Sequence, residues 1–184
     1  MRTISKYIAI AIAALILAAI TALVSIQRFS DGPVEPMQGG PFRTGQIMDQ
    51  PFDWTSTDAK RVEFELTGFG TSRVAGFLMH EGKAYMTCDL GFIWNRLESG
   101  NTKRMLHLIY TFKRWHTDAV ADGRARVRVD GKIYPANFVK VEDPQVNLAL
   151  RAKMEERARN NLGGTLPPLP ANGPRDVWFF RMDG

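Results

Sequence analysis

Residues 124–141 read RARVRVDGKIYPANFVKV, and this stretch decides the fold. Apolar and polar side chains alternate over 124–129 and again over 132–141, which is typical of strands with one buried face. Asp130-Gly131 between them suits the type I′ turn of a two-residue hairpin. Pairing outward from this turn predicts a buried face made of Val127, Val129, Tyr134, Ala136 and Phe138.

The opposite face of the first strand carries Arg124, Arg126 and Arg128. We expect a solvated strand face, and binding of an anion is the alternative. Together with the basic residues Lys103, Arg104, Lys113 and Arg114, this face could also orient the domain against anionic lipid headgroups.

Three more strands precede the hairpin and one follows it. Residues 61–66 alternate strictly, and residues 73–79 and 84–88 flank a predicted Glu81-Gly82 turn. That turn pairs Phe77 with Met86 and Ala75 with Cys88, so we expect Cys88 to be a packed thiol rather than a nucleophile. Residues 176–182 predict the last strand, and residues 105–112 allow a further one.

Two helices are predicted among these strands. Residues 113–121 suit a short helix. A longer one begins after the N-cap candidate Asp143 and ends at Gly163, with an apolar residue at every fourth position. These apolar positions are Val146, Leu150, Met154, Ala158 and Leu162. The fold class is therefore α+β, a mainly antiparallel split β-barrel of about six strands with a helix packed near the C-terminus.

Residues 7–26 read YIAIAIAALILAAITALVSI, twenty residues without a charge. A helix of this length crosses a hydrocarbon core of about 30 Å. We favour an uncleaved membrane anchor, and the alternatives are a cleaved signal peptide and a buried core helix. Arg2 and Lys6 precede the span, whereas Arg28 follows it with Asp31 close by, so the positive-inside rule puts residues 1–6 in the cytoplasm.

The predicted organisation is thus a cytoplasmic N-terminus (1–6), a transmembrane helix (7–26), a tether (27–53) and a barrel domain (54–184). The expected location is the inner membrane, with the barrel in the periplasm. Residues 31–53 contain four prolines and four glycines, which indicates an extended tether. Wrapping around the barrel is the alternative, since Phe42, Ile47 and Phe52 are apolar enough to dock.

Composition excludes several classes of protein. The net charge of the chain is +5, but residues 31–184 hold 21 basic and 19 acidic residues, so we expect no nucleic-acid partner. A single cysteine excludes a disulfide framework, and the three scattered histidines predict no metal site. No catalytic motif stands out, and we assign no catalytic residue.

The order of these elements resembles the split β-barrel of the pyridoxamine-phosphate-oxidase-like superfamily, and within it the deazaflavin-dependent nitroreductase family. The resemblance covers roughly residues 62–182. The phrases that carry it are LTGFGTSR (66–73), HEGKAYM (80–86), WHTDAVADGRARVRVDGKIYPANFVKVEDP (115–144) and VWFF (177–180).

The resemblance implies a cofactor site. The glycine-rich turn would hold phosphate through Thr67, Gly68, Gly70, Ser72 and Arg73, while Tyr85 and Trp115 would shape the ring pocket. His116 would be a proton donor or a porphyrin ligand, or else an ordinary partly buried histidine. Phe69 and Thr71 depart from the family, whose turn is basic at these positions.

Three functions follow as hypotheses. The first is a membrane-anchored, non-catalytic module that binds a ligand or assembles with partners in the cell envelope. The second is a reductase that uses FMN or a deazaflavin and acts on a lipophilic substrate such as a quinone. The third is a barrel that binds haem or another tetrapyrrole. The resemblance also implies a homodimer with a small-molecule ligand between its subunits.

Overall fold

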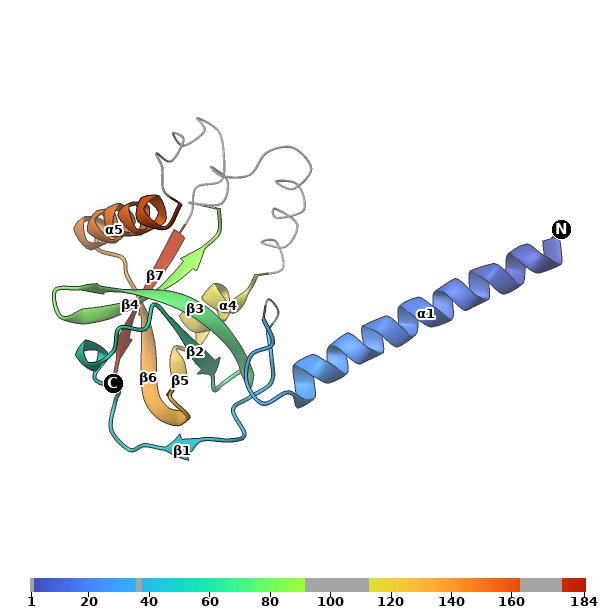
Figure 1. Cartoon of the computed structure of the whole chain (residues 1–184), viewed down its shortest axis with the longest axis horizontal. Coiled ribbons are helices and arrows are strands. Elements are labelled where there is room, and N and C mark those ends of the chain that lie inside the picture. Colours follow the sequence, from blue (N-terminus) through green and yellow to red (C-terminus); the bar gives the residue numbers. More distant parts are fainter. Residues whose placement is uncertain (1, 36–37, 92–112, 163–176) are drawn as a thin grey trace.

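The computed structural model describes residues 2–35, 38–91, 113–162 and 177–184, and within them the fold is a β-barrel with an apolar N-terminal helix (Figure 1). Six antiparallel strands close the barrel in the order β6-β5-β2-β3-β4-β7, because β6 also pairs with β7. These strands are β2 (Arg61–Leu66), β3 (Thr71–His80), β4 (Lys83–Asp89), β5 (Arg124–Val129), β6 (Lys132–Lys140) and β7 (Val177–Asp183). The predicted fold class is confirmed.

Both predicted hairpins have the expected turns. Asp130 and Gly131 adopt φ of 49° and 74°, and Glu81 and Gly82 adopt φ of 50° and 73°. Positive φ at both central residues defines a type I′ turn, whose twist matches that of the flanking strands. The β5–β6 register runs outward from Val129 and Lys132, and the β3–β4 register runs from His80 and Lys83 to Phe77 and Met86.

Alternate residues of the six strands fill the barrel. Phe64, Met86, Val127 and Phe180 are fully buried there, as is Cys88, in agreement with a packed thiol. The short helix α4 (Trp115–Ala121) adds Trp115 at one end of the barrel, where its ring lies 4.9 Å from that of Phe64. The aromatic rings of Phe52 and Trp54 pack near the other end, against Tyr134 and Phe77 respectively.

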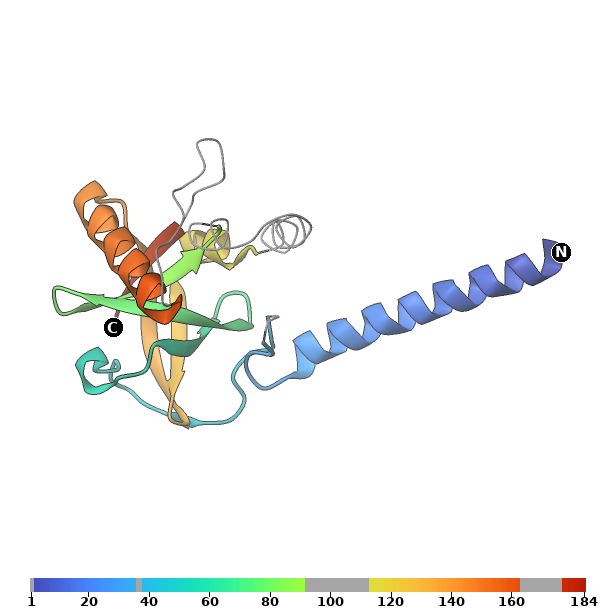
Figure 2. The same ribbon diagram turned by 45° about the horizontal axis from the view of Figure 1, so that its top comes forward.

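Helix α5 (Pro144–Leu162) packs on the outside of β3, β4 and β7. The Asp143 carboxylate accepts a hydrogen bond from the Gln145 amide at 2.8 Å and so caps the helix as predicted. Leu150 is fully buried against Leu78, Tyr85, Val177 and Phe179. The predicted helix end at Gly163 and the strand predicted over 105–112 lie outside the described residues. In both views α5 lies on the side of the barrel away from α1 (Figure 2).

Helix α1 (Arg2–Phe29) contains one apolar stretch, Lys6–Phe29, that is long enough to cross a membrane. The mean hydropathy over 18 residues of this stretch is 2.7, and none of these residues is buried against the rest of the chain. This exposure argues against the buried core helix considered above, because an all-apolar helix in water needs a cover. An apolar helix near the N-terminus can also belong to a signal sequence, so the helix by itself does not separate an anchor from a cleaved leader.

The segment after α1 lies on the barrel, which is the second of the two arrangements considered for it. Gly39 and Ser72 exchange backbone hydrogen bonds of 2.9 and 3.1 Å, and the buried Phe42 donates its amide to the Glu65 carboxylate at 2.9 Å. Further along, β1 (Gln46–Ile47) pairs in parallel with the start of β6, and the 3-10 helix η1 (Trp54–Ser56) leads into β2. An extended tether therefore does not describe residues 30–35 and 38–53, which we call the docked segment.

Two glycines permit this docking. The backbone at Gly39 and Gly40 runs directly against the chain that leaves α1. A Cβ atom at Gly39 would lie 1.9 Å from the carbonyl oxygen of Gly32, and one at Gly40 would lie 2.5 Å from that of Ser30. Only residues without a side chain fit this approach.

Candidate functional site

The β2–β3 turn contains the residues that the resemblance assigns to a cofactor phosphate. The Thr67 hydroxyl donates to the Arg124 carbonyl at 3.1 Å, and the Ser72 hydroxyl donates to the Gly40 carbonyl at 2.5 Å. The Gly70 amide donates to the Leu66 carbonyl at 2.9 Å. Phosphate recognition needs such donors, and in this turn they already bind backbone carbonyls.

Gly68 has a packing role in the same turn. A Cβ atom there would lie 2.3 Å from a carboxylate oxygen of Asp122, the residue that follows α4. The turn is thus pressed against the end of α4, and a side chain at position 68 would collide with the Asp122 carboxylate.

Arg73 and Tyr85 lie on opposite sides of the barrel wall. Arg73 of β3 is paired with Phe64 of β2, so both side chains point into the barrel. The Arg73 guanidinium donates a hydrogen bond to the Gln38 side chain at 3.0 Å, and burial lowers the pKa of Arg73. Tyr85 faces outward beneath α5, where burial raises its pKa. Its strand partner Leu78 is seven residues beyond Thr71 along β3, so roughly 23 Å of strand, at 3.3 Å per residue, separates the level of Tyr85 from the turn.

Trp115 and His116 begin α4 but have different environments. Trp115 is buried inside the barrel, where its ring also lies 5.4 Å from that of Phe180. The His116 ring packs against the Trp178 ring at an interplanar angle of 76°, with 4.8 Å between the ring centroids. The eight residues named by the resemblance therefore do not surround one group within a single chain, and they do not fit a flavin or a haem there. A reductase that uses FMN or a deazaflavin therefore stays an untested alternative hypothesis.

The arginines of β5 are paired with carboxylates rather than left for an anion. The Arg124 guanidinium donates three hydrogen bonds to the Asp122 carboxylate and remains mostly exposed. Arg126 binds Glu65 at 2.8 Å, and Arg128 binds Glu63 at 2.5 Å. Except at Arg124, the expected solvated face is therefore covered, and each charge in the row has an acidic partner.

Asp31 ties the start of the docked segment to this row. Burial opposes its ionisation, but hydrogen bonds from the Arg43 and Thr44 amides and the Thr44 hydroxyl, together with the Arg128 charge, outweigh it and lower its pKa to about 2. The Arg128 guanidinium lies 3.1 Å from the carboxylate and also packs over the Phe42 ring, 4.5 Å from its centroid. Arg128 thus links β5 to the docked segment at two points, Asp31 and Phe42.

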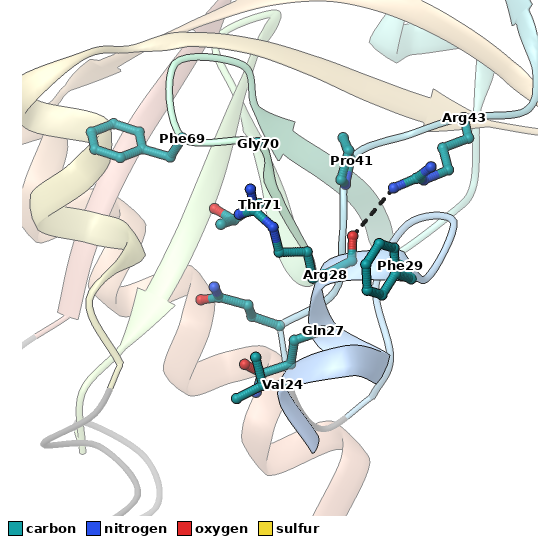
Figure 3. Close-up of a pocket in the computed structure, with 10 residues that line it drawn as sticks. Val24, Gln27, Arg28, Phe29, Pro41, Arg43, Phe69, Gly70 and Thr71 are labelled. Carbon is teal, nitrogen blue, oxygen red and sulfur yellow. Dashed lines mark hydrogen bonds between the residues drawn. The ribbon is translucent and has the colours of Figure 1, made fainter. Parts of the chain in front are cut away.

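A groove of about 610 Å³ lies between the end of α1, the docked segment and the β2–β3 turn. We call it the anchor groove. Its lining residues are Val24, Gln27, Arg28, Phe29, Gln38, Pro41, Arg43, Phe69, Gly70 and Thr71. In Figure 3 the Arg28 side chain extends from α1 toward Thr71, while Arg43 comes from the other side and donates a hydrogen bond of 3.3 Å to the Arg28 carbonyl.

The anchor groove has a positive charge and apolar edges. Its lining includes two arginines and no carboxylate. Within the described part of the chain neither Arg28 nor Arg43 forms a salt bridge, in contrast to the β5 arginines. Phe29 is 71% exposed and Phe69 is 43% exposed. By comparison, a second groove of about 680 Å³ over Arg128 also contains Asp31 and Glu63, so its charges are mixed.

Sequence reasoning missed the roles of Glu65, Asp31 and Arg43. Strand alternation predicts that Glu65 points away from the barrel interior. The only signal that this outer face is covered was Phe42, an apolar residue in an otherwise polar segment. Among the described residues no group of three or more His, Cys, Asp or Glu side chains could hold a metal ion. Comparison with protein-family models, curated proteins and solved structures finds no match to this chain.

Proposed function

We propose that the chain is a single-pass membrane protein of the cell envelope whose barrel binds a ligand or a partner without catalysing a reaction. In this proposal α1 is an uncleaved anchor in the inner membrane, with its N-terminus in the cytoplasm and the barrel outside it. The barrel would belong to the pyridoxamine-phosphate-oxidase-like split-barrel type, and its partner would be a small molecule, a second copy or another envelope protein.

The attachment of the barrel to α1 carries this proposal. The Ser30 hydroxyl accepts a hydrogen bond from the Gly40 amide at 2.8 Å, and the Arg43 guanidinium binds the Arg28 carbonyl. With the Gly39–Ser72 bridge, these bonds hold β3 close to the last turn of the helix. A barrel fixed in this way stays at the membrane surface, as suits a module that assembles with other envelope components.

The absence of catalysis is supported by how the barrel is built. The hydroxyls that would hold a cofactor phosphate donate to backbone carbonyls, and side chains of the described residues fill the interior. Hydride transfer by a flavin or deazaflavin requires the cofactor to be bound and oriented by the protein. The described residues offer no such arrangement within one chain.

Labelling in intact cells tests the anchor and its orientation. Ile47→Cys introduces a thiol at a position that is 70% exposed, whereas the buried Cys88 gives a low background. With the full chain in its native membrane, we expect Ile47→Cys to react with a membrane-impermeant maleimide added outside the inner membrane, and the parent chain not to react. Labelling only after lysis would refute the orientation, and recovery in the carbonate-soluble fraction would refute the anchor.

An absorption spectrum of the purified full chain tests the absence of a redox cofactor. We expect a colourless protein that takes up none of FMN, deazaflavin or haem when each is added. A bound flavin or deazaflavin would refute this part of the proposal in favour of a reductase, and a bound tetrapyrrole would refute it in favour of a haem-binding barrel.

A further inference from the structure

We propose that the anchor groove binds the phosphate of an anionic phospholipid from the membrane that α1 enters. This inference rests on the membrane anchoring proposed above. Lys6–Phe29 comprises 24 residues, which at 1.5 Å per residue form a helix about 36 Å long. Since the hydrocarbon core is about 30 Å thick, the last turn of α1 reaches the headgroup layer. The groove opens at this depth.

The charges of the groove suit a phosphate. Arg28 and Arg43 bring guanidinium groups from two segments, and planar guanidinium donors match the oxygens of a phosphate. The nearest acid along the chain, Asp31, is taken up by Arg128 and by the amides of Arg43 and Thr44. The two arginines are therefore left without an acidic partner within the described part of the chain. Thr71 adds a hydroxyl to the same lining.

The apolar edges of the groove favour a lipid over a free phosphate. Val24 and Phe29 continue the apolar surface of α1 into the groove, and Phe69 lies across the β2–β3 turn from them (Figure 3). Aromatic side chains are enriched at the membrane interface, where a phospholipid presents both a charged headgroup and the start of its acyl chains. A soluble phosphate would satisfy the arginines but would leave Phe29 and Phe69 exposed to water.

Lipid retention by the full chain tests the site. The protein is reconstituted in nanodiscs that contain equal amounts of phosphatidylcholine and phosphatidylglycerol, and the lipids that remain bound after release are counted by native mass spectrometry. We expect the parent chain to retain phosphatidylglycerol preferentially. Because one basic residue near an anionic surface changes binding about fivefold, Arg28→Gln should lower this preference about fivefold, and the double variant Arg28→Gln/Arg43→Gln about 25-fold.

A matched control removes the same charge elsewhere. Lys132 and Arg159 are exposed residues on the β5–β6 hairpin and on α5, so Lys132→Gln/Arg159→Gln should keep the parent preference. Arg28→Gln should not disturb folding, because among the described residues the Arg28 side chain donates no hydrogen bond to the protein. We expect its near-UV circular dichroism to equal that of the parent chain.

The outcomes separate this site from the proposed function. A chain that is extracted by carbonate would refute the anchor and the site together. A chain that stays in the membrane but loses phosphatidylglycerol equally in the groove and control variants would refute the site alone. Competition by millimolar inorganic phosphate as strong as that by phosphatidylglycerol would show that the groove takes a soluble anion, and would also overturn the assignment to a lipid.

Discussion

Glu65 is a buried carboxylate that joins the docked segment to the barrel, and replacing it with alanine tests this arrangement. The residue is 2% exposed, and its Oε2 atom accepts hydrogen bonds from the Phe42 amide at 2.9 Å and from the Arg126 guanidinium at 2.8 Å. One oxygen atom thus satisfies a buried amide and balances a partly buried charge. We predict that Glu65→Ala is among the most destabilising polar substitutions in the chain.

The expected magnitude follows from the exposure of the two partners. Removing one member of a fully buried ion pair costs about 3–5 kcal/mol, but the Arg126 side chain is 31% exposed, so water recovers part of its solvation and we take about 2 kcal/mol. The Phe42 amide, left buried without an acceptor, adds about 1–2 kcal/mol. Glu65→Ala should therefore lower the free energy of unfolding by about 3–4 kcal/mol. Glu65→Gln keeps an acceptor for the amide and should lower it by about 2 kcal/mol.

Denaturant unfolding of the full chain in detergent micelles, followed by near-UV circular dichroism, measures these changes. Glu35→Ala is the matched control, because the Glu35 side chain, on the docked segment, is 49% exposed and pairs with the exposed Arg61 of β2. An exposed pair contributes less than about 1 kcal/mol. A Glu65→Ala variant no less stable than Glu35→Ala would refute the buried position of this carboxylate and the docking of the segment over it.

Three further predictions concern the docked segment and α5. Phe42→Ala removes a buried ring whose burial stabilises the docked segment by about 2–3 kcal/mol, so residues 30–53 should become cleavable by protease at low enzyme concentration. The control Ile47→Ala, at an exposed position, should leave cleavage unchanged. In the folded state the pKa of Asp31 is about 2, below its ordinary value of 3.8. The ionised Asp31 carboxylate therefore stabilises the fold above pH 3.8, and this contribution is lost as the pH falls from 3.8 towards 2. The free energy of unfolding measured over this range should fall less steeply in Asp31→Asn than in the parent chain. Asp143→Ala removes the cap of α5 and should lower the free energy of unfolding by about 1 kcal/mol in the same denaturant assay.

The barrel could be predicted from the sequence because its signals are local. Alternation over 124–129 and 132–140 together with Asp130-Gly131 determines a hairpin without reference to any other part of the chain. The same holds for the Asp143 cap and the apolar positions of α5, which depend on neighbours within a few residues. Closure of the sheet through the β6–β7 pairing is not local, and it entered the prediction only through the resemblance to split barrels.

The position of the docked segment could not be predicted because it depends on contacts with residues far along the chain. Strand periodicity shows that Glu63 and Glu65 face away from the barrel interior, and such a face is exposed unless something covers it. The cover is supplied by Phe42 and its neighbours, more than twenty residues earlier, in a segment whose prolines and glycines are equally typical of a flexible tether. A high content of proline and glycine predicts that a segment lacks regular secondary structure, but it does not predict whether that segment packs against the rest of the chain.

The candidate site shows the same limit in its charges. The row at Arg124, Arg126 and Arg128 is conspicuous in the sequence, yet each member is paired with an acid that is distant or unremarkable in the linear order. Arg28 and Arg43 are isolated in the sequence, and the structure brings them to one groove without a carboxylate. What decides whether a cation is available to an anionic ligand is the number of acids around it in space, and the sequence does not give that number.

This difference in pairing also links the orientation of the anchor to the anchor groove. Arg28 and Arg43 follow the apolar span and oppose the charge bias of Arg2 and Lys6, on which the predicted orientation depends. An anionic phospholipid in the groove would neutralise part of this opposing charge on the barrel side of the membrane. If the proposed orientation and lipid site both hold, the groove and the orientation are not independent, because the same two arginines that weaken the topology signal in the sequence would give the barrel its contact with the headgroup layer.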